Sequence, residues 1–346
     1  MKFQVFPENA DIAPRKRVKF GIDPTFPRLH LGHLVPLRLV QKMKAEGHEV
    51  TIVLGTFTAQ LGDPSEREKT RPILTEEEVL QNASKITVKV RQLLGHDISI
   101  FNNGEASFNK MTVPDMMLLA SKFTVQQALT RDSFQKRLED QHPLGLHELF
   151  VPILQGWDSV ALKTEIEIGG QDQLFNFQVA RQLQEAWGQK PQTCIMLPII
   201  NGTDGRKMSK SLGNCIFLDE TPDDMFGKVM SVPDTVMEEW FPLFCDFTVD
   251  DASIHPMDKK KMLATEIVTQ THSLEAAWKA GEAFVASVQN RELPLNVPTI
   301  SASTLLEAVV MMTGLSKTAA RQRLKEGGIR VNNEKVFDEK HELSAG

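Results

Sequence analysis

Short apolar runs alternate with longer amphipathic segments through the first 200 residues of the chain. The short runs are rich in β-branched residues and predict buried strands at 17–20, 49–55, 97–102, 165–168 and 193–200. In the longer segments apolar residues recur at helical spacing, which predicts helices at 34–43, 75–94, 147–162 and 174–187. Strands and helices in this order indicate a doubly wound parallel α/β sheet, and we expect the run at 193–200 to close it.

The remaining segments are helical or broken by prolines. Many charges at helical spacing in 111–141 predict a helical insertion in the sheet, at about residues 105–150. The expected parts are, in order, a first domain of 1–220, an α-helical domain at 221–290, a linker at 291–300 and a small α+β module at 301–346. The small module should hold two short helices and a β-hairpin that turns at 332–333.

The composition is that of an ordinary globular protein, with 346 residues of which 41% are hydrophobic and 24% charged. No apolar run approaches the roughly 18 residues that a bilayer-spanning helix needs, and the N-terminus lacks the apolar core of a signal peptide. These features exclude a membrane protein and predict a cytoplasmic location. Three widely spaced cysteines fit reduced thiols and argue against a Cys-based zinc site.

The net charge of −6 argues against a protein that binds nucleic acid over its whole surface. Basic residues nevertheless gather near the C-terminal end, where six of them stand against two acidic residues between positions 317 and 335. The six are Lys317, Arg321, Arg323, Lys325, Arg330 and Lys335. A local basic patch of this kind is suited to the phosphate groups of a nucleic acid.

The first candidate site is the Gly- and Pro-rich turn between the strand at 17–20 and the helix at 34–43, which contains His30-Leu-Gly-His33. A helix N-terminus after a parallel strand offers free N–H groups and a dipole that favour a bound phosphate. Gly32 would let that ligand approach the backbone closely. Alternatively, the two histidines only cap the helix or pack at its start. A metal site is the poorer interpretation, because no third ligand lies at a suitable spacing.

Two further stretches carry candidate chemistry. Lys207-Met-Ser-Lys-Ser211 lies between glycine-containing turns, and its lysines and hydroxyl groups are suited to close over a polyphosphate. Gly169-Gly-Gln-Asp-Gln173 follows a predicted strand as a glycine turn, where an acidic residue of a doubly wound fold binds ribose hydroxyls. The alternatives are a solvated basic loop and an ordinary tight turn.

Together these three stretches resemble the arrangement of the class I aminoacyl-tRNA synthetases, whose catalytic domain is Rossmann-like. The chain is most similar to the bacterial tyrosyl-tRNA synthetases, in the branch whose lysine loop reads KMSKS. Beyond the two histidines, the stretches that match are 21–25, 62–65, 154–162, 169–173 and 207–214. Residues 315–336 resemble the small ribosomal-protein-type RNA-binding module that ends these enzymes. That module usually continues with further strands, so we expect a shortened or truncated form here.

The resemblance implies an enzyme that activates an amino acid with ATP, releases pyrophosphate and passes the aminoacyl group to its tRNA, tRNA(Tyr). Magnesium would enter with ATP, without a metal site held by the protein, and a homodimer is implied. The implied catalytic groups, which stabilise charge on the phosphates, are His30, His33, Lys207, Lys210, Arg67 and Arg71. The implied ATP-binding residues are Gly21, Asp23, Thr25, Gly32, Gly170, Asp172, Lys207, Met208, Ser209, Lys210 and Ser211. The implied amino-acid-binding residues are Asp63, Val151, Gln155, Asp158 and Gln173, and the implied RNA-binding residues are Lys317, Arg321, Arg323, Lys325 and Arg330.

The expected amino acid is L-tyrosine. Asp158 matches the carboxylate with which these enzymes accept the phenol hydroxyl, and a buried polar partner of this kind rejects phenylalanine. Three positions depart from the family: Val151 and Trp157 stand where tyrosine is usual, and Thr56 stands where aspartate is usual. These departures leave a close analogue of tyrosine as the alternative substrate.

The chain contains no tyrosine, although it has 19 phenylalanines and 4 tryptophans. Our hypothesis is selection, natural or by design, for an enzyme that can be made while charged tyrosyl-tRNA is scarce. A duplicate enzyme that is specialised for a tyrosine analogue or resists a tyrosine-like inhibitor is the alternative. A non-catalytic RNA-binding regulator is a further alternative, although such proteins usually lose the ATP-binding residues that are present here.

Overall fold

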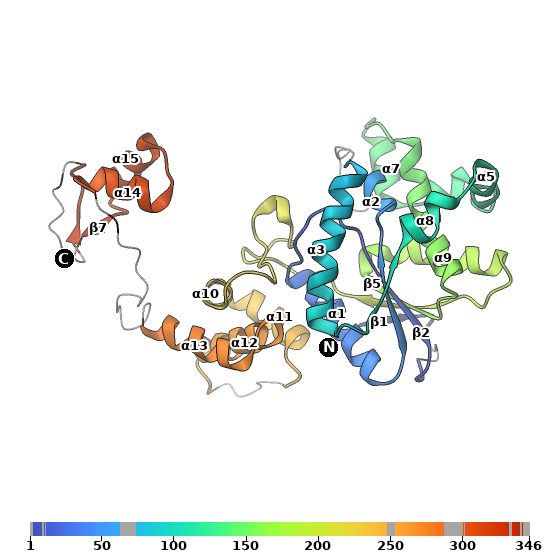
Figure 1. The fold of residues 1–346 in the computed structure, drawn as a ribbon, viewed down its shortest axis with the longest axis horizontal. Coiled ribbons are helices and arrows are strands. Elements are labelled where there is room, and N and C mark those ends of the chain that lie inside the picture. The colour runs from blue at the N-terminus through green and yellow to red at the C-terminus, as the bar shows by residue number, and fades with distance from the viewer. Residues whose placement is uncertain are drawn as a thin grey trace. The chain divides into compact units, whose positions relative to one another are not determined.

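The computed structural model of the chain describes residues 3–8, 10, 12–62, 74–247, 253–286, 300, 302–331, 334–339 and 341. The chain divides into two compact units, Met1–Glu282 and Ala283–Gly346, whose elements are labelled in Figure 1. The linker expected at 291–300 lies, except for its last residue, outside the described residues. No described helix combines the length and the hydropathy that crossing a membrane requires.

The larger unit is built on a six-stranded sheet with the order β1-β6-β5-β2-β3-β4. Its strands are β1 (Gln4–Phe6), β2 (Arg17–Ile22), β3 (Glu49–Leu54), β4 (Ser99–Asn102), β5 (Ile166–Gly170) and β6 (Thr193–Leu197). Strands β2 to β6 pair in parallel, as the apolar runs predict. The prediction that β6 closes the sheet is wrong, because β1 pairs with it antiparallel and forms the edge. A strand of three residues is too short to give a recognisable periodicity.

Helices cover both faces of this sheet. In Figure 1, α1 (Leu31–Ala45) and α3 (Glu76–Leu94) lie on one side of the strands, and α8 (Leu146–Ala161) and α9 (Leu174–Ala186) lie on the other. Helix α3 begins and ends as predicted: Thr75 and Glu78 form a capping box at its start, and Gly95 follows its last residue with a φ of 96°. The prediction of a turn at 169–173 needs correction, because Gly169 and Gly170 still pair with β6 and only 171–173 turn, as a 3₁₀ helix.

The strand order reverses direction between β2 and β5. From β2 the chain proceeds outward to β3 and β4, whereas from β5 it proceeds outward to β6 on the other side. In open α/β sheets, ligands bind outside the carboxyl ends of the strands at such a reversal, because the connecting loops diverge there and leave a crevice. The carboxyl ends of β2 and β5 are therefore the place to look for a site.

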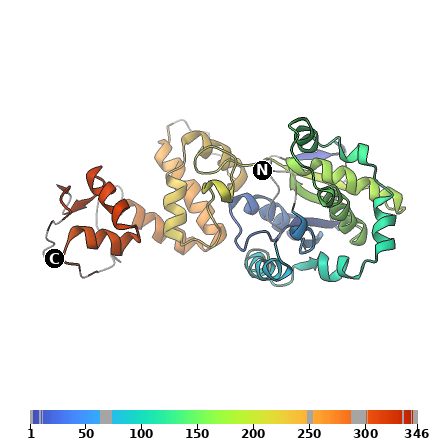
Figure 2. The ribbon, with the colours of Figure 1, turned by 90° about the horizontal axis from the view of Figure 1, so that it is seen from above.

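Further helices complete the larger unit. Helix α2 (Thr58–Leu61) follows β3. The helices at the predicted insertion are α4 (Asn103–Ala106), α5 (Val113–Ala120), α6 (Val125–Ala128) and α7 (Asp132–Glu139), with a 3₁₀ turn at Phe108–Lys110. The later helices are α10 (Pro222–Met230), α11 (Asp234–Phe244), α12 (Pro256–Thr271) and α13 (Leu274–Phe284), and both views show α10 beside α12 (Figures 1 and 2). The indole Nε1–H of Trp240 on α11 donates to the carbonyl of Asn201 at 2.9 Å, which ties these helices to the segment that follows β6.

The smaller unit contains α14 (Leu305–Thr313), α15 (Lys317–Lys325), β7 (Arg330–Val331) and β8 (Glu334–Lys335). The two strands pair antiparallel, as the sequence predicts, although the turn at 332–333 lies outside the described residues. Apolar side chains of both helices, among them Leu305, Val309 and Leu324, form its core. Gly314 ends α14 with a φ of 67°, a left-handed conformation that glycine adopts without strain.

Candidate active site

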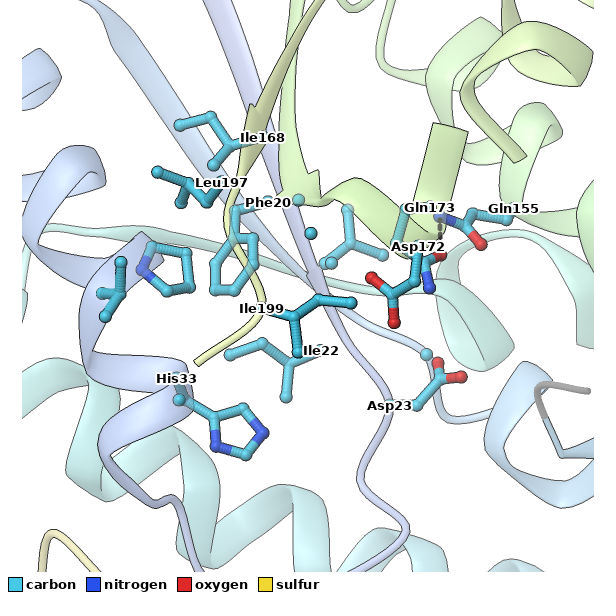
Figure 3. A pocket seen from close by; sticks show the side chains of 18 of the residues that line it. Phe20, Ile22, Asp23, His33, Gln155, Ile168, Asp172, Gln173, Leu197 and Ile199 are labelled. Atoms are coloured by element: carbon cyan, nitrogen blue, oxygen red, sulfur yellow. Dashed lines mark hydrogen bonds between the residues drawn. The ribbon is translucent and has the colours of Figure 1, made fainter. Parts of the chain in front are cut away.

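A cavity of about 350 Å³ opens at the carboxyl ends of β2 and β5, where the strand order reverses. Figure 3 shows His33 on one side of it and Gln155 and Gln173 on the other, with the carboxyl groups of Asp23 and Asp172 between them in this view. Most of the residues singled out from the sequence line this cavity. They are Gly21, Asp23, Thr25, His30, Gly32, His33, Val151, Gln155, Asp158, Gly170, Asp172, Gln173, Lys207, Met208, Ser209 and Lys210.

Other predicted residues do not take part in what is described of this cavity. Ser211 does not line it, and its hydroxyl instead forms a 2.9 Å hydrogen bond with the hydroxyl of Ser209. Asp63, Arg67 and Arg71 lie outside the described residues, so their roles stay predictions from the resemblance. Among the residues that the structure describes, no group of three or more His, Cys, Asp or Glu side chains is arranged to hold a metal ion.

The two histidines form the first turn of α1. The backbone N–H of Gly32 donates to Nδ1 of His30 at 3.1 Å, and the backbone N–H of His30 donates to Nδ1 of His33 at 3.1 Å, so the pair completes a capping box. The ring of His30 also explains Gly32, since a Cβ at that position would lie 2.8 Å from Cε1 of His30. From the sequence we expected Gly32 to make room for a ligand. In the structure the group nearest to it is the ring of His30 that caps the helix.

Both imidazoles are neutral at ordinary pH. Burial, reinforced by the positive charge of Lys210, lowers the pKa of His30 to about 3. Burial, together with the neighbouring ring of His30 and the positive charge of Lys210, also holds the pKa of His33 well below its ordinary value. Because each Nδ1 accepts a backbone hydrogen bond, the proton of each neutral ring resides on Nε2. The cavity is therefore lined by two uncharged N–H donors at the N-terminus of a helix.

The lysine loop, residues 207–211, faces this helix N-terminus. The sulfur of Met208 lies 3.8 Å from the position of a Cβ on Gly32, and Lys210 lowers the pKa of both histidines by its charge. The side chain of Asn214 holds the loop in shape: it accepts from the backbone N–H of Ser209 at 2.8 Å and donates to the carbonyl of Lys207 at 3.1 Å. The loop thus brings two ammonium groups to the edge of the cavity where the imidazole donors lie.

Two carboxylates lie between the ends of the cavity. The ammonium of Lys207 lies 3.7 Å from the carboxylate of Asp172, which joins the lysine loop to the 3₁₀ turn after β5. Gly170 makes room for this carboxylate, because a Cβ there would lie 2.4 Å from Oδ1 of Asp172. Asp23, after β2, accepts a 2.8 Å hydrogen bond from the hydroxyl of Thr58. Both carboxylates are placed to accept hydrogen bonds from the hydroxyl groups of a bound molecule.

At the far end, α8 and α9 contribute a network of amides. The side-chain N–H₂ of Asn176 donates to Oε1 of Gln155 at 2.9 Å and to Oε1 of Gln173 at 2.7 Å. A weaker contact of 3.4 Å links the two glutamines directly and is drawn in Figure 3. These bonds fix the orientation of Gln155 and Gln173, both of which line the cavity. Asn176 was not singled out from the sequence, because nothing in its surroundings there distinguishes it from other polar helix residues.

Asp158 is buried at this end, with only 3% of its surface exposed. Its Oδ2 accepts from the side chain of Asn103 at 3.0 Å, whereas its Oδ1 is buried without a hydrogen-bond partner. Burial raises the pKa of Asp158 to about 7, although Lys19 and Asn103 oppose the shift. A buried acceptor without a partner costs free energy until a donor from a ligand reaches it.

Of the three departures from the family pattern, one lines the cavity. Val151 is fully buried at its wall. Trp157 does not line the cavity, and its Nε1–H donates instead to the hydroxyl of Ser107 at 2.9 Å. The hydroxyl of Thr56 accepts from the backbone N–H of Gly104 at 3.2 Å, outside the cavity lining. Val151 is therefore the departure that bears directly on ligand selection.

The five predicted RNA-binding residues belong to the smaller unit, and all of them are exposed. Four of these residues lie on α15, and the fifth, Arg330, lies on β7. Lys317, Arg321 and Lys325 are spaced four residues apart, so they share one side of the helix. Nε of Arg321 donates to the carboxylate of Glu339 at 2.6 Å, which offsets part of this charge.

Comparison with known proteins shows the family to which the chain is similar. Residues 13–289 match the family model described as tRNA synthetases class I (W and Y). The tyrosine--tRNA ligase of Carboxydothermus hydrogenoformans is 42% identical over 345 residues, covering 93% of this chain and 84% of that protein. The corresponding ligase of Geobacter sulfurreducens is 40% identical over 347 residues, covering 95% and 86%.

The fold also resembles solved structures. A C-terminally truncated mitochondrial tyrosyl-tRNA synthetase of Coccidioides posadasii superimposes with a TM-score of 0.63 at 21% identity, covering 78% of this chain and 83% of that one. At this level of identity the likeness concerns the fold alone.

Proposed function

The chain belongs to the class I tRNA synthetases of the tyrosine and tryptophan type, and we propose that it activates L-tyrosine with ATP and transfers the tyrosyl group to tRNA(Tyr). The observation that carries this proposal is Asp158, a buried carboxyl group with one oxygen unpartnered in a cavity otherwise suited to ATP. Two further findings support the proposal. The relatives of this chain at about 40% identity are tyrosine--tRNA ligases, and its lysine loop reads KMSKS, as in the branch that the sequence resembles.

In the first step the carboxylate of tyrosine attacks the α-phosphorus of ATP and pyrophosphate leaves, so no covalent enzyme intermediate is required. Negative charge moves onto the leaving oxygens, and catalysis consists of stabilising that charge. We assign this task to the Nε2–H groups of His30 and His33 and to the ammonium groups of Lys207 and Lys210. Neutral donors suit the role because they are already directed at the phosphates and need no proton transfer. Mg²⁺ enters with ATP as part of that substrate.

The remaining residues hold the two substrates. We assign Asp172 to the ribose hydroxyls, and Gln155 and Gln173 to the orientation of the amino acid. The unpartnered oxygen of Asp158 would accept from the phenol hydroxyl. Phenylalanine would leave this acceptor buried and unsatisfied, so the same group excludes it. Asp63, Arg67 and Arg71 remain assigned to substrate and pyrophosphate binding by resemblance alone.

Pyrophosphate exchange tests the proposal. The purified chain is assayed with each of the twenty amino acids, among which tryptophan matters because its indole N–H is also a donor, and with a panel of tyrosine analogues. Tyrosine should give the highest kcat/KM, and Lys210→Ala should reduce exchange by at least 100-fold without changing the unfolding midpoint. If an analogue outperforms tyrosine, the alternative substrate holds, and Val151 is the first residue to examine because it forms part of the cavity wall.

We also propose two macromolecular partners that bind to the surface of the chain: a second copy of the chain and the tRNA. Exposed apolar side chains concentrate on the helical insertion, and we propose that they form the interface of a homodimer; they are Val113, Met117, Leu118, Val125, Leu138 and Leu146. The basic residues of α15 and β7 are proposed to bind phosphates of the tRNA, which predicts an affinity that falls steeply with salt. A cytoplasmic location would follow from these partners.

A further inference from the structure

A buried ion pair lines the cavity and has no part in the chemistry assigned so far. Lys19 on β2 and Glu167 on β5 are partners in the register of the two strands, and the ammonium lies 2.9 Å from Oε1 of the carboxylate. Both side chains are only 2% exposed. Both also line the cavity. Charged residues are almost never buried to this degree unless they are paired.

The hydrogen bonds of this pair are complete. The ammonium of Lys19 donates to the hydroxyl of Ser159 at 2.7 Å and to the carbonyl of Gln155 at 3.1 Å, in addition to its bond with Glu167. The other oxygen of Glu167 accepts from Ser159 at 3.1 Å and from the side chain of Gln192. Such a pair gives little net stability, since desolvating two charges costs about as much free energy as their attraction returns. Its presence beside the cavity therefore calls for a functional explanation.

The residues that Lys19 contacts lie close to Asp158 along α8. Gln155 and Ser159 both lie on α8, and Asp158 is the neighbour of Ser159 on the same helix. Three charges act on the carboxyl group of Asp158: Lys19 favours its ionised form, whereas Glu167 and Asp23 oppose it. On the α4 side it contacts the uncharged amide of Asn103. Among the residues that the structure describes, Lys19 is thus the cation that acts on Asp158, and its direct ion pair is formed with Glu167 instead.

We propose that Lys19 and Glu167 act together as positioning residues for the amino-acid substrate. The ammonium of Lys19 favours the ionised form of Asp158 and fastens α8 to β2. Glu167 occupies the ammonium, so that Lys19 does not pair with Asp158 and consume the oxygen that the substrate hydroxyl needs. This inference rests on the proposed function in one respect, namely that the substrate hydroxyl is received by Asp158.

Four proteins test the inference by their pH profiles: the wild type, Glu167→Gln, Lys19→Met, and the double variant Lys19→Met/Glu167→Gln. The measurement is kcat/KM for tyrosine in pyrophosphate exchange between pH 5.5 and 9, with phenylalanine as a substrate without the hydroxyl. The midpoint of the wild-type profile should move down by about one pH unit in Glu167→Gln and up by a similar amount in Lys19→Met. In the double variant it should return close to the wild-type value, because the two opposing charges are removed together.

The split between KM and kcat gives a second readout. In Glu167→Gln the ammonium is released toward Asp158, so KM for tyrosine should rise about tenfold while kcat changes little. KM for phenylalanine should not rise and should fall to the extent that the ammonium satisfies the acceptor on Asp158, because phenylalanine has no donor for it. The preference for tyrosine over phenylalanine should therefore fall at least about tenfold.

A matched control is available on α8, the helix that carries Asp158. Glu148 on α8 forms a buried ion pair with Arg137, and neither residue lines the cavity. Glu148→Gln should leave the pH midpoint and the tyrosine preference unchanged. The inference is overturned if Glu167→Gln and Glu148→Gln behave alike, or if the midpoints of all pH profiles agree within about 0.3 pH units. Either result would mean that the ion pair of Lys19 and Glu167 has only a structural role. If Lys19→Met does not fold, Glu167→Gln and the double variant decide the matter. Failure of the proposed function would be visible separately, as a wild type that does not prefer tyrosine.

Discussion

Replacing Asp158 with asparagine tests whether this buried carboxyl group is kept for function at the expense of stability. The substitution preserves the size of the side chain, and its amide oxygen can still accept the 3.0 Å hydrogen bond from Asn103. What it removes is the charge. Burial raises the pKa of Asp158 from 3.8 to about 7, so in the folded protein the ionised form is disfavoured relative to the unfolded chain.

The size of the effect follows from this difference in pKa. Three pKa units at about 1.4 kcal/mol each give a penalty of about 4 kcal/mol in the free energy of unfolding. The sign follows from proton linkage: the folded state binds the proton more tightly, so there is no penalty below the unfolded pKa near 3.8. The penalty grows as the pH rises and is complete above about 7. Asparagine does not titrate, so the variant should be more stable than the wild type by about 1–4 kcal/mol at pH 8.

Denaturant unfolding of the larger unit at several pH values measures this gain. The advantage of Asp158→Asn should shrink steadily toward pH 4, while tyrosine activation at pH 8 falls by roughly 10- to 150-fold, the contribution of a hydrogen bond to a charged group. Asp97→Asn is the matched control, because Lys44 lowers the pKa of that exposed carboxyl group and its removal should change stability in the opposite direction. A variant that is less stable than the wild type at pH 8 would refute the reasoning.

Three further predictions concern the helix N-terminus, the apolar surface and the composition. His30→Asn retains a capping side chain but loses the Nε2–H donor, so pyrophosphate exchange should fall about 100-fold while stability stays nearly unchanged. His30→Ala should in addition lower the free energy of unfolding by about 1 kcal/mol. Equal stability losses in the two variants would contradict the separation of roles. Leu118→Lys, at a site 54% exposed on α5, should shift the sedimentation of the chain from dimer to monomer, and an unchanged profile would place the interface elsewhere. In a reconstituted translation system without tyrosyl-tRNA synthetase, the mRNA of this chain should yield the enzyme, because it has no tyrosine codon, and then a tyrosine-containing reporter. The mRNA of Phe337→Tyr should yield neither product. Equal yields from the two mRNAs would contradict the selection hypothesis.

The parts of the fold that were predicted are those in which local signals agree. At α3, helical spacing, a capping box at Thr75 and a glycine at position 95 all indicate the same boundaries, and the helix spans Glu76–Leu94. Strand β1 gave no such signal, because its three residues form an edge strand only through pairing with β6, which lies almost 190 positions later in the chain. An edge formed by so distant a pairing leaves no mark in the local sequence.

Two residues that line the cavity and escaped prediction, Lys19 and Glu167, have a role that depends on strand register. Lys19 and Glu167 each interrupt an apolar run, and a charged residue in a strand covered on both faces is a signal that deserves weight. Only the pairing of β2 with β5 shows that the two residues face each other. The stretch around His30 and His33 and the lysine loop were singled out in advance because their candidate chemistry is contained in consecutive residues.

The two interpretations of the histidines, as helix caps and as proposed phosphate donors, are compatible, because each uses a different nitrogen of the ring. Capping requires Nδ1 of His30 and of His33 to accept a backbone N–H, and an accepting nitrogen carries no proton. With the ring kept neutral by burial, the proton has only Nε2 to occupy. The cap thereby fixes the tautomer that a phosphate donor needs, and it does so before any ligand binds. A histidine that did not cap would have to acquire this orientation and tautomer during the reaction.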